Sequence, residues 1–154
     1  MSNSASLKHA AFDCGTGWIA VLASEKGLLK STLPQNSTQE ALKLLGDDVH
    51  KAHQSPDYFH NLEERLKAYS CGQKVTFPDE LDLSRATPFQ RQVWQITRLI
   101  PYGETRSYRW VAEQIGNPRA VRAVGQALGR NPLLIIIPCH RVVNSNGKLG
   151  GFGG

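Results

Sequence analysis

Apolar residues near the start of the chain cluster in short runs that glycine-containing turns separate from one another. The runs cover residues 10–13, 18–23 and 28–32, and the turns between them cover residues 14–17 and 25–27. Short apolar runs bounded by such turns are typical of β-strands joined as hairpins. The pattern therefore predicts a small antiparallel meander across residues 8–33.

Two helices are predicted after the meander. Ser37 and Glu40 have the spacing of a capping box, so a helix begins there and ends at Gly46. Pro56 begins the second helix, and Gly72 ends it, because the aromatic residues and leucines between them recur at helical spacing. Strands followed by helices predict an α/β domain for the first half of the chain.

Three further helices are predicted after a connector at residues 73–86. Their start and stop residues are Thr87-Pro88 and Pro101, Ser107 and Gly116, and Asn117-Pro118 and Gly129. The first should bury Phe89, Val93, Ile96 and Ile100, and the second Trp110, Val111 and Ile115. The last two helices, joined by a three-residue turn, have the layout of a helix-turn-helix in a mainly α domain.

Charge divides the chain into two parts of opposite sign. Residues 1–84 carry 8 Lys and Arg against 11 Asp and Glu, a net charge of −3, whereas residues 85–154 carry 10 against 2, a net charge of +8. Nine of those 10 basic residues are arginines, which hold phosphate with a planar fork. The division predicts domains at 1–84 and 85–154, with nucleic acid as partner of the second. A basic surface that serves only solubility is the alternative.

The most apolar segment, residues 133–143, carries the candidate chemistry. Five aliphatic residues lead to Pro138, which fixes φ, and then to Cys139, His140 and Arg141. Neighbouring cationic and proton-accepting groups lower the pKa of a cysteine and favour the nucleophilic thiolate. A buried strand in which the cysteine is merely a small apolar residue explains the apolar run equally well. A buried strand does not explain why His140 and Arg141, two polar residues, stand at the end of the apolar run.

Other binding classes find little support in the sequence. Three cysteines, odd in number and far apart, do not form a disulfide framework, and a reducing, cytoplasmic setting follows. His50, His53 and His60 lack a cysteine at zinc-site spacing, so we expect no metal. Neither a secretory signal nor an apolar run of membrane-spanning length is present, so we expect no membrane partner.

The last predicted helix is unusual because almost all its residues are small. These are Ala120, Val121, Ala123, Val124, Gly125 and Ala127. A partner's backbone can come close to such a surface, and Arg122 stands alone above it. Tight packing between two helices also requires small residues, but it does not explain the arginine. DNA contact and ordinary structure therefore both stay open for this helix.

The second half of the chain resembles the O6-alkylguanine-DNA alkyltransferases, also called methylated-DNA–protein-cysteine methyltransferases. The matching segments are residues 87–94, 100–105 with Ser107 and Tyr108, 119–125, 131–132 and 137–143. The similarity is continuous from about residue 86 to 154, and the run Pro-Cys-His-Arg at 138–141 is its most specific motif. The resemblance implies a ribonuclease-H-like first domain and a winged-helix-like second domain.

The resemblance also implies an activity. Cys139 would take a methyl or alkyl group from O6 of guanine in double-stranded DNA, once per molecule and without a cofactor. His140 would act as base through a water, Asn131 would orient the site, and Tyr108 would give a proton to the leaving guanine. We expect a monomer that acts in the cytoplasm, at the nucleoid.

The target atom lies inside the duplex, so the base must be rotated out of the stack. By resemblance, Arg122 fills the vacated space from the minor groove. The other DNA-contacting positions carried over are Tyr108, Ser107, Ala120, Ala123 and Gly125, and those of the base pocket are Leu128, Leu134, Val142, Phe152 and Gly153. Leu134 stands where some members of the family carry proline.

One feature of the family is missing from the sequence. In the family, a helix after the segment 144–154 carries a glutamate that completes a Cys-His-Glu relay. This sequence ends at Gly154, and Glu104 and Glu113 match no relay position. Either the chain is a truncated or processed form, or the protein works with an incomplete relay. We expect transfer to be slower than in a complete member, while DNA binding is retained.

Three other classes of function are weighed against this activity. A sensor could bind alkylated DNA without chemistry, which the missing glutamate favours but the retained Cys139 does not. A helix-turn-helix regulator explains the charge division but not Tyr108, Asn131 and the Pro-Cys-His-Arg run together. A cysteine hydrolase would use the same thiol and imidazole but has no need of the arginines.

Overall fold

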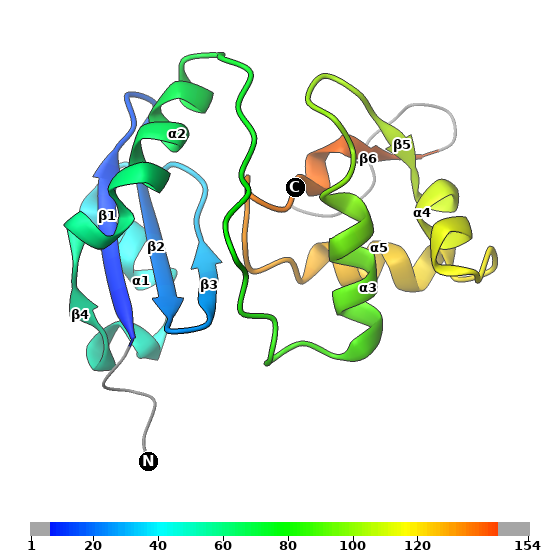
Figure 1. Ribbon diagram of the computed structural model, residues 1–154, viewed down its shortest axis with the longest axis horizontal. Coiled ribbons are helices and arrows are strands. Elements are labelled where there is room, and N and C mark those ends of the chain that lie inside the picture. Colours follow the sequence, from blue (N-terminus) through cyan, green and yellow to red (C-terminus); the bar gives the residue numbers. More distant parts are fainter. Residues whose placement is uncertain (1–6, 145–154) are drawn as a thin grey trace. The chain divides into compact units, whose positions relative to one another are not determined.

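The computed structural model describes residues 7–144 and divides the chain into two compact units, Met1–Asp82 and Leu83–Gly154 (Figure 1). The first unit contains β1 (Lys8–Asp13), β2 (Trp18–Ser24), β3 (Gly27–Ser31), α1 (Thr38–Lys43), η2 (Asp47–Lys51), β4 (His53–Gln54), η3 (Pro56–Phe59) and α2 (His60–Ser70). The second contains α3 (Pro88–Thr97), β5 (Arg106–Ser107), α4 (Tyr108–Ile115), α5 (Val121–Gly129), η4 (Cys139–Arg141) and β6 (Val142–Val143). An α/β unit thus precedes a mainly helical one, as predicted, and the predicted boundary at 84 lies two residues further along.

The predicted meander is confirmed. β1 pairs with β2 and β2 with β3, both antiparallel, in a sheet of order β3-β2-β1-β4. The short strand β4 was not predicted, and it pairs with β1 in parallel. The connector also contributes, because Leu28 N–H donates to Glu80 O at 2.9 Å and Asp82 N–H donates to Leu28 O at 2.8 Å. This pairing covers the edge of β3, which would otherwise present unpaired backbone groups.

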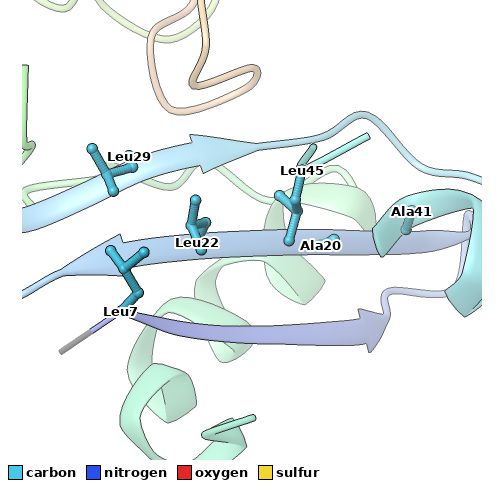
Figure 2. Packing of buried hydrophobic residues seen from close by; sticks show 6 residues of the cluster. All are labelled: Leu7, Ala20, Leu22, Leu29, Ala41 and Leu45. Carbon is cyan, nitrogen blue, oxygen red and sulfur yellow. The ribbon is translucent and has the colours of Figure 1, made fainter. Parts of the chain in front are cut away.

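Apolar side chains bury both faces of this sheet. On one face, residues of β2 and β3 and the residue before β1 pack against α1 and the segment after it, and the cluster consists of Leu7, Ala20, Leu22, Leu29, Ala41 and Leu45 (Figure 2). The alternate residues of β1 and β2 lie on the other face, where Phe12 meets Phe59 of η3 with ring centroids 6.4 Å apart. The helices on the two sides explain why β2 is buried along nearly its whole length.

Helix α3 begins as predicted, and Val93 and Ile100 of the predicted apolar face are buried, but the rest of the buried face differs. Thr87 and Gln90 form a complete capping box. Trp94 and Thr97 are buried with Val93, whereas Phe89 and Ile96 are only half-buried. A polar bond explains the tryptophan, because its indole Nε1–H donates to the Ala127 carbonyl of α5 at 2.9 Å. Periodicity of apolar residues could not reveal that bond.

The helix-turn-helix is present with two corrections. Helix α4 buries Tyr108, Val111 and Ala112, while Trp110 stays half-exposed with the Arg106 guanidinium 5.5 Å from its ring centroid. Helix α5 begins at Val121, so Asn117 is not its N-cap. Ala120 N–H donates to Asn117 O at 3.0 Å in a separate turn, and the first helical bond runs from Val124 N–H to Ala120 O. None of the helices within residues 7–144 is long and apolar enough to cross a membrane.

Candidate active site

The apolar run before Cys139 forms a turn and not a strand. Ile137 N–H donates to Leu133 O at 2.8 Å, and Ile135 adopts φ 76°, which is unusual for a β-branched residue. Pro138 then has φ −81° and ψ 65°, the inverse γ-turn geometry, which brings Cys139 N–H to Ile137 O at 2.8 Å. The thiol therefore lies at the first position of the short helix η4.

Asn131 holds this turn from inside. Its Nδ2–H donates to Ile137 O at 2.8 Å, and its Oδ1 accepts from Leu133 N–H at 2.8 Å. The side chain is buried, so both bonds are formed where water does not compete well. The predicted role of Asn131 in orienting the site stays a prediction, but its position beside the thiol turn suits it.

Burial controls the ionisation of Cys139. It raises the pKa of the thiol above its usual value, while a hydrogen bond with Asn131 and the backbone N–H groups of Cys139 and His140 oppose that rise. The sequence-based expectation of a lowered cysteine pKa is therefore wrong for the free protein. Removal of the thiol from water outweighs the polar neighbours, and the resting group is a neutral thiol.

His140 is shifted toward its neutral form. Partial desolvation lowers the pKa of the imidazole, and the positive charge of the adjacent Arg141 lowers it further. A neutral imidazole can accept a proton, whereas an imidazolium cannot. Consecutive residues of η4 thus carry a protonated thiol and an unprotonated imidazole, the protonation states that general-base activation of a nucleophile requires.

A short parallel ladder brings Tyr108 to the same region. In it Arg106 of β5 pairs with Val142 of β6, and Ser107 with Val143, so Tyr108 at the start of α4 follows strand residues that flank η4. Its ring is buried and lies against α5, because a Cβ placed on Gly125 would be 3.8 Å from Tyr108 Cε1. Ser107 caps α4, since its Oγ accepts from Trp110 N–H at 2.9 Å.

The remaining predicted site residues separate into exposed and buried groups. Arg122 is exposed on α5, and Ala120, Ala123 and Gly125 are half-buried. Leu128 is 1% exposed and Val142 is fully buried, so both belong to the core of the second unit, whereas Leu134 is half-buried. Phe152 and Gly153 lie outside the described residues.

Comparisons with known proteins agree on one family. Residues 88–154 match the model of the 6-O-methylguanine DNA methyltransferase DNA-binding domain. A methylated-DNA–protein-cysteine methyltransferase of Mycolicibacterium paratuberculosis is 54% identical over 101 residues, 66% of this chain and 61% of that protein. The crystal structure of the Mycobacterium tuberculosis O6-methylguanine methyltransferase is 39% identical with a TM-score of 0.76, over 96% of this chain and 85% of that one.

The chain belongs to the methylated-DNA–protein-cysteine methyltransferase family. A further structure, described as the M. tuberculosis protein in complex with DNA, has a TM-score of 0.75 at 37% identity. The match to the curated relatives spans less than two thirds of their length, 61% in M. paratuberculosis and 64% in Mycobacterium bovis.

Sequence reasoning gave no role to two features of this methyltransferase-family site. In the sequence Arg141 is only a charged neighbour of the thiol, but its side-chain hydrogen bond to Ile100 O links η4 to the segment after α3. The turn at Ile135 gave no local signal, because isoleucine disfavours positive φ and five aliphatic residues in a row suggest a strand. Within residues 7–144, no group of three or more His, Cys, Asp and Glu residues could hold a metal ion.

Proposed function

We propose that this chain repairs DNA by direct reversal, as a methylated-DNA–[protein]-cysteine S-methyltransferase. It transfers a methyl or alkyl group from O6 of guanine to Cys139, and each molecule acts once because a thioether does not hydrolyse readily. The observation that carries the proposal is the buried Cys139 thiol, turned into the site by Asn131 and adjacent to a histidine biased to its neutral form.

The transfer needs proton movements that the site residues can supply. His140 accepts the thiol proton, and Cys139 Sγ then forms a bond to the alkyl carbon while the carbon–O6 bond breaks. The electron pair stays with the guanine, which takes a proton from the Tyr108 hydroxyl. The proton on His140 then passes through solvent to the Tyr108 oxygen, which restores both residues. The net change is an exchange of one alkyl group for one hydrogen between guanine and sulfur, so no cofactor is required.

The raised pKa of Cys139 makes the base necessary. At neutral pH few thiols would be ionised, and displacement at carbon needs the thiolate. His140 removes the proton as the reaction proceeds, because desolvation and Arg141 keep its imidazole unprotonated. Asn131, which contributes a hydrogen bond to Cys139, stabilises the developing negative charge on sulfur.

We propose that α5 approaches the minor groove of double-stranded DNA carrying O6-alkylguanine. Arg122 is exposed on this helix, and Ala120, Ala123 and Gly125 have little side chain to keep a backbone away. Arg122 would occupy the space left by the rotated base. The M. tuberculosis protein, to which this chain is similar, has a structure in complex with DNA, and this supports DNA as a partner of the present chain.

The base pocket is proposed around the thiol turn and the strand that follows it. Leu134, half-buried next to the strained turn, and Val142, directly after η4, are the described candidates, with Leu128 behind them in the core. Phe152 and Gly153 would complete the pocket by family resemblance.

Finer features of the fold and its setting are also proposed. A parallel β4 beside β1 and helices on both faces of the sheet support a ribonuclease-H-like first domain. The helix-turn-helix with its β5–β6 ladder supports a winged-helix-like second domain. Three free cysteines fit a reducing cytoplasm, and a monomer suits a protein that meets one lesion once.

Intact-protein mass after incubation with a duplex holding one O6-methylguanine tests the proposal. We expect a gain of one methylene, which the Cys139→Ala variant loses. Cys71→Ala is a matched control, because Cys71 is a free but exposed cysteine, and it should gain the same mass. A gain that survives in Cys139→Ala, or no gain at all, would refute transfer to Cys139. No gain with selective binding to the lesion would instead indicate a damage sensor.

A further inference from the structure

The Arg141 side chain joins the thiol-bearing turn to the end of helix α3. Its Nη1–H donates to the Ile100 carbonyl at 2.8 Å, and Ile100 is 1% exposed. The guanidinium also lies over the Tyr102 ring, 5.6 Å from the ring centroid. Ile100 lies three residues past the last residue of α3, so the guanidinium supplies a donor to a buried carbonyl that lies outside the helix.

The backbone of Arg141 closes the same turn from its other end. Arg141 N–H donates to Pro138 O at 2.9 Å, which spans Cys139 and His140. A shift of the Arg141 backbone would therefore be transmitted to the two residues that carry the chemistry, and the side-chain bond to Ile100 opposes such a shift. Asn131 fixes the segment before Cys139, and Arg141 fixes the segment after it.

We propose that Arg141 is a positioning residue for the transfer reaction, which clamps η4 to Ile100 and Tyr102 so that Cys139 and His140 keep their reactive arrangement. The inference rests on the proposed function. Arg141 itself touches neither the alkyl group nor the thiol in this scheme, and acts through its neighbours.

The clamp also fixes a positive charge beside the base. Charged and titratable groups on the elements around η4 are Arg91 and Arg98 on α3, Arg106 and Glu104 near β5, Tyr102, and Tyr108 on α4. After desolvation, the charge of the Arg141 guanidinium is the second cause that lowers the pKa of His140. Holding that guanidinium in place thus also helps to hold His140 in its proton-accepting form.

Lysine should replace Arg141 only in part. A lysine retains the charge and one possible bond to Ile100, but it lacks the planar fork that donates and stacks at the same time. The variant Arg141→Lys should therefore keep the electrostatic effect on His140 while losing rigidity. Arg141→Gln should lose both.

Arg91→Gln provides a matched control. Arg91 lies on α3 in the same unit and also donates a guanidinium N–H to a backbone carbonyl, that of Ala86, at 3.2 Å. It is half-buried like Arg141 but adjoins neither the thiol nor the imidazole in sequence. A loss that came only from a missing arginine–carbonyl bond would appear in both variants.

The test measures single-turnover methyl transfer against pH for the three variants and the unmodified protein, with the His140 pKa followed by NMR without DNA. We expect Arg141→Gln to slow transfer by roughly 10- to 100-fold, as a small misplacement of reacting groups does. Without the positive charge the His140 pKa should rise, so the rate should begin to fall at a higher pH as the solution is acidified. Arg141→Lys should keep the original pH profile with part of the rate.

Several outcomes would overturn the inference. A wild-type rate and pH profile in Arg141→Gln would do so, and so would an equal loss of rate in Arg91→Gln. If the unmodified protein transfers no methyl group, the proposed function fails. An unchanged His140 pKa in Arg141→Gln would then overturn the clamp separately. If Arg141→Gln does not fold, Arg141→Lys still decides, because wild-type transfer in that variant contradicts a need for the planar fork.

Discussion

Replacing Asn131 with alanine should destabilise the second unit more than an ordinary polar substitution. The side chain is 9% exposed and makes two bonds of 2.8 Å, one to Leu133 N–H and one to Ile137 O. Alanine removes both bonds and leaves space that its methyl group cannot fill. The turn they hold contains Ile135 at positive φ, a conformation that persists only where its surroundings enforce it.

The expected loss follows from the two partners. Depriving the buried Leu133 N–H of its acceptor costs about 1–3 kcal/mol. Ile137 O still accepts from Cys139 N–H at 2.8 Å, so the loss of its second donor costs only about 1 kcal/mol. We therefore expect the free energy of unfolding to fall by roughly 2–4 kcal/mol, a large part of the ~5–15 kcal/mol of a typical domain.

Urea unfolding followed by tryptophan fluorescence measures this change. Asn117→Ala is the matched control, because Asn117 is an exposed asparagine in the helix-turn-helix whose backbone, and not its side chain, forms the turn. It should change stability by no more than about 0.5 kcal/mol. A loss below about 1 kcal/mol in Asn131→Ala, or an equal loss in Asn117→Ala, would refute the account of the turn.

Three further predictions concern the cap of α3, the edge of the sheet and a half-buried histidine. Thr87→Ala should lower the free energy of unfolding by about 1 kcal/mol, because Thr87 Oγ1 accepts from Gln90 N–H at 3.1 Å; an unchanged denaturation midpoint would contradict this. Gly27→Ala should cost about 2 kcal/mol or more, since Gly27 has φ 148° and the new Cβ would lie 2.5 Å from Glu80 O; full stability in thermal unfolding would refute that clash. Burial lowers the pKa of His9, whose Nδ1 finds no hydrogen-bond partner within residues 7–144. The unfolded chain therefore binds a proton more readily than the folded one, so stability should fall as pH drops below about 6.5, and His9→Leu should flatten that dependence.

Local signals predicted the three strands of the meander and the capped starts of α1, α3 and α4 correctly. The meander follows from glycine turns between apolar runs, and Ser37, Thr87 and Ser107 all accept the expected capping bonds. Each of these features depends on residues within four positions of one another. Physical chemistry at that range depends little on the rest of the molecule, so the sequence was sufficient.

Features that depend on distant partners could not be predicted in this way. Trp94 is buried because its indole reaches a carbonyl on α5, and β4 exists because β1 offers it an edge. The run 133–137 turns because Asn131 bonds to both of its ends. In isolation those five aliphatic residues favour a strand, so tertiary hydrogen bonds override their local preference.

The pKa shifts of the thiol and the imidazole share their largest cause, which acts on them in opposite directions. Desolvation disfavours charge, so it raises the pKa of Cys139 and lowers that of His140. Both groups are therefore neutral at pH values between the lowered pKa of His140 and the raised pKa of Cys139. Under the proposed function, acidification below the His140 pKa should remove the base, whereas alkaline pH should form thiolate without it. The same burial that makes the thiol unreactive in the free protein thus makes its activation depend on the histidine beside it.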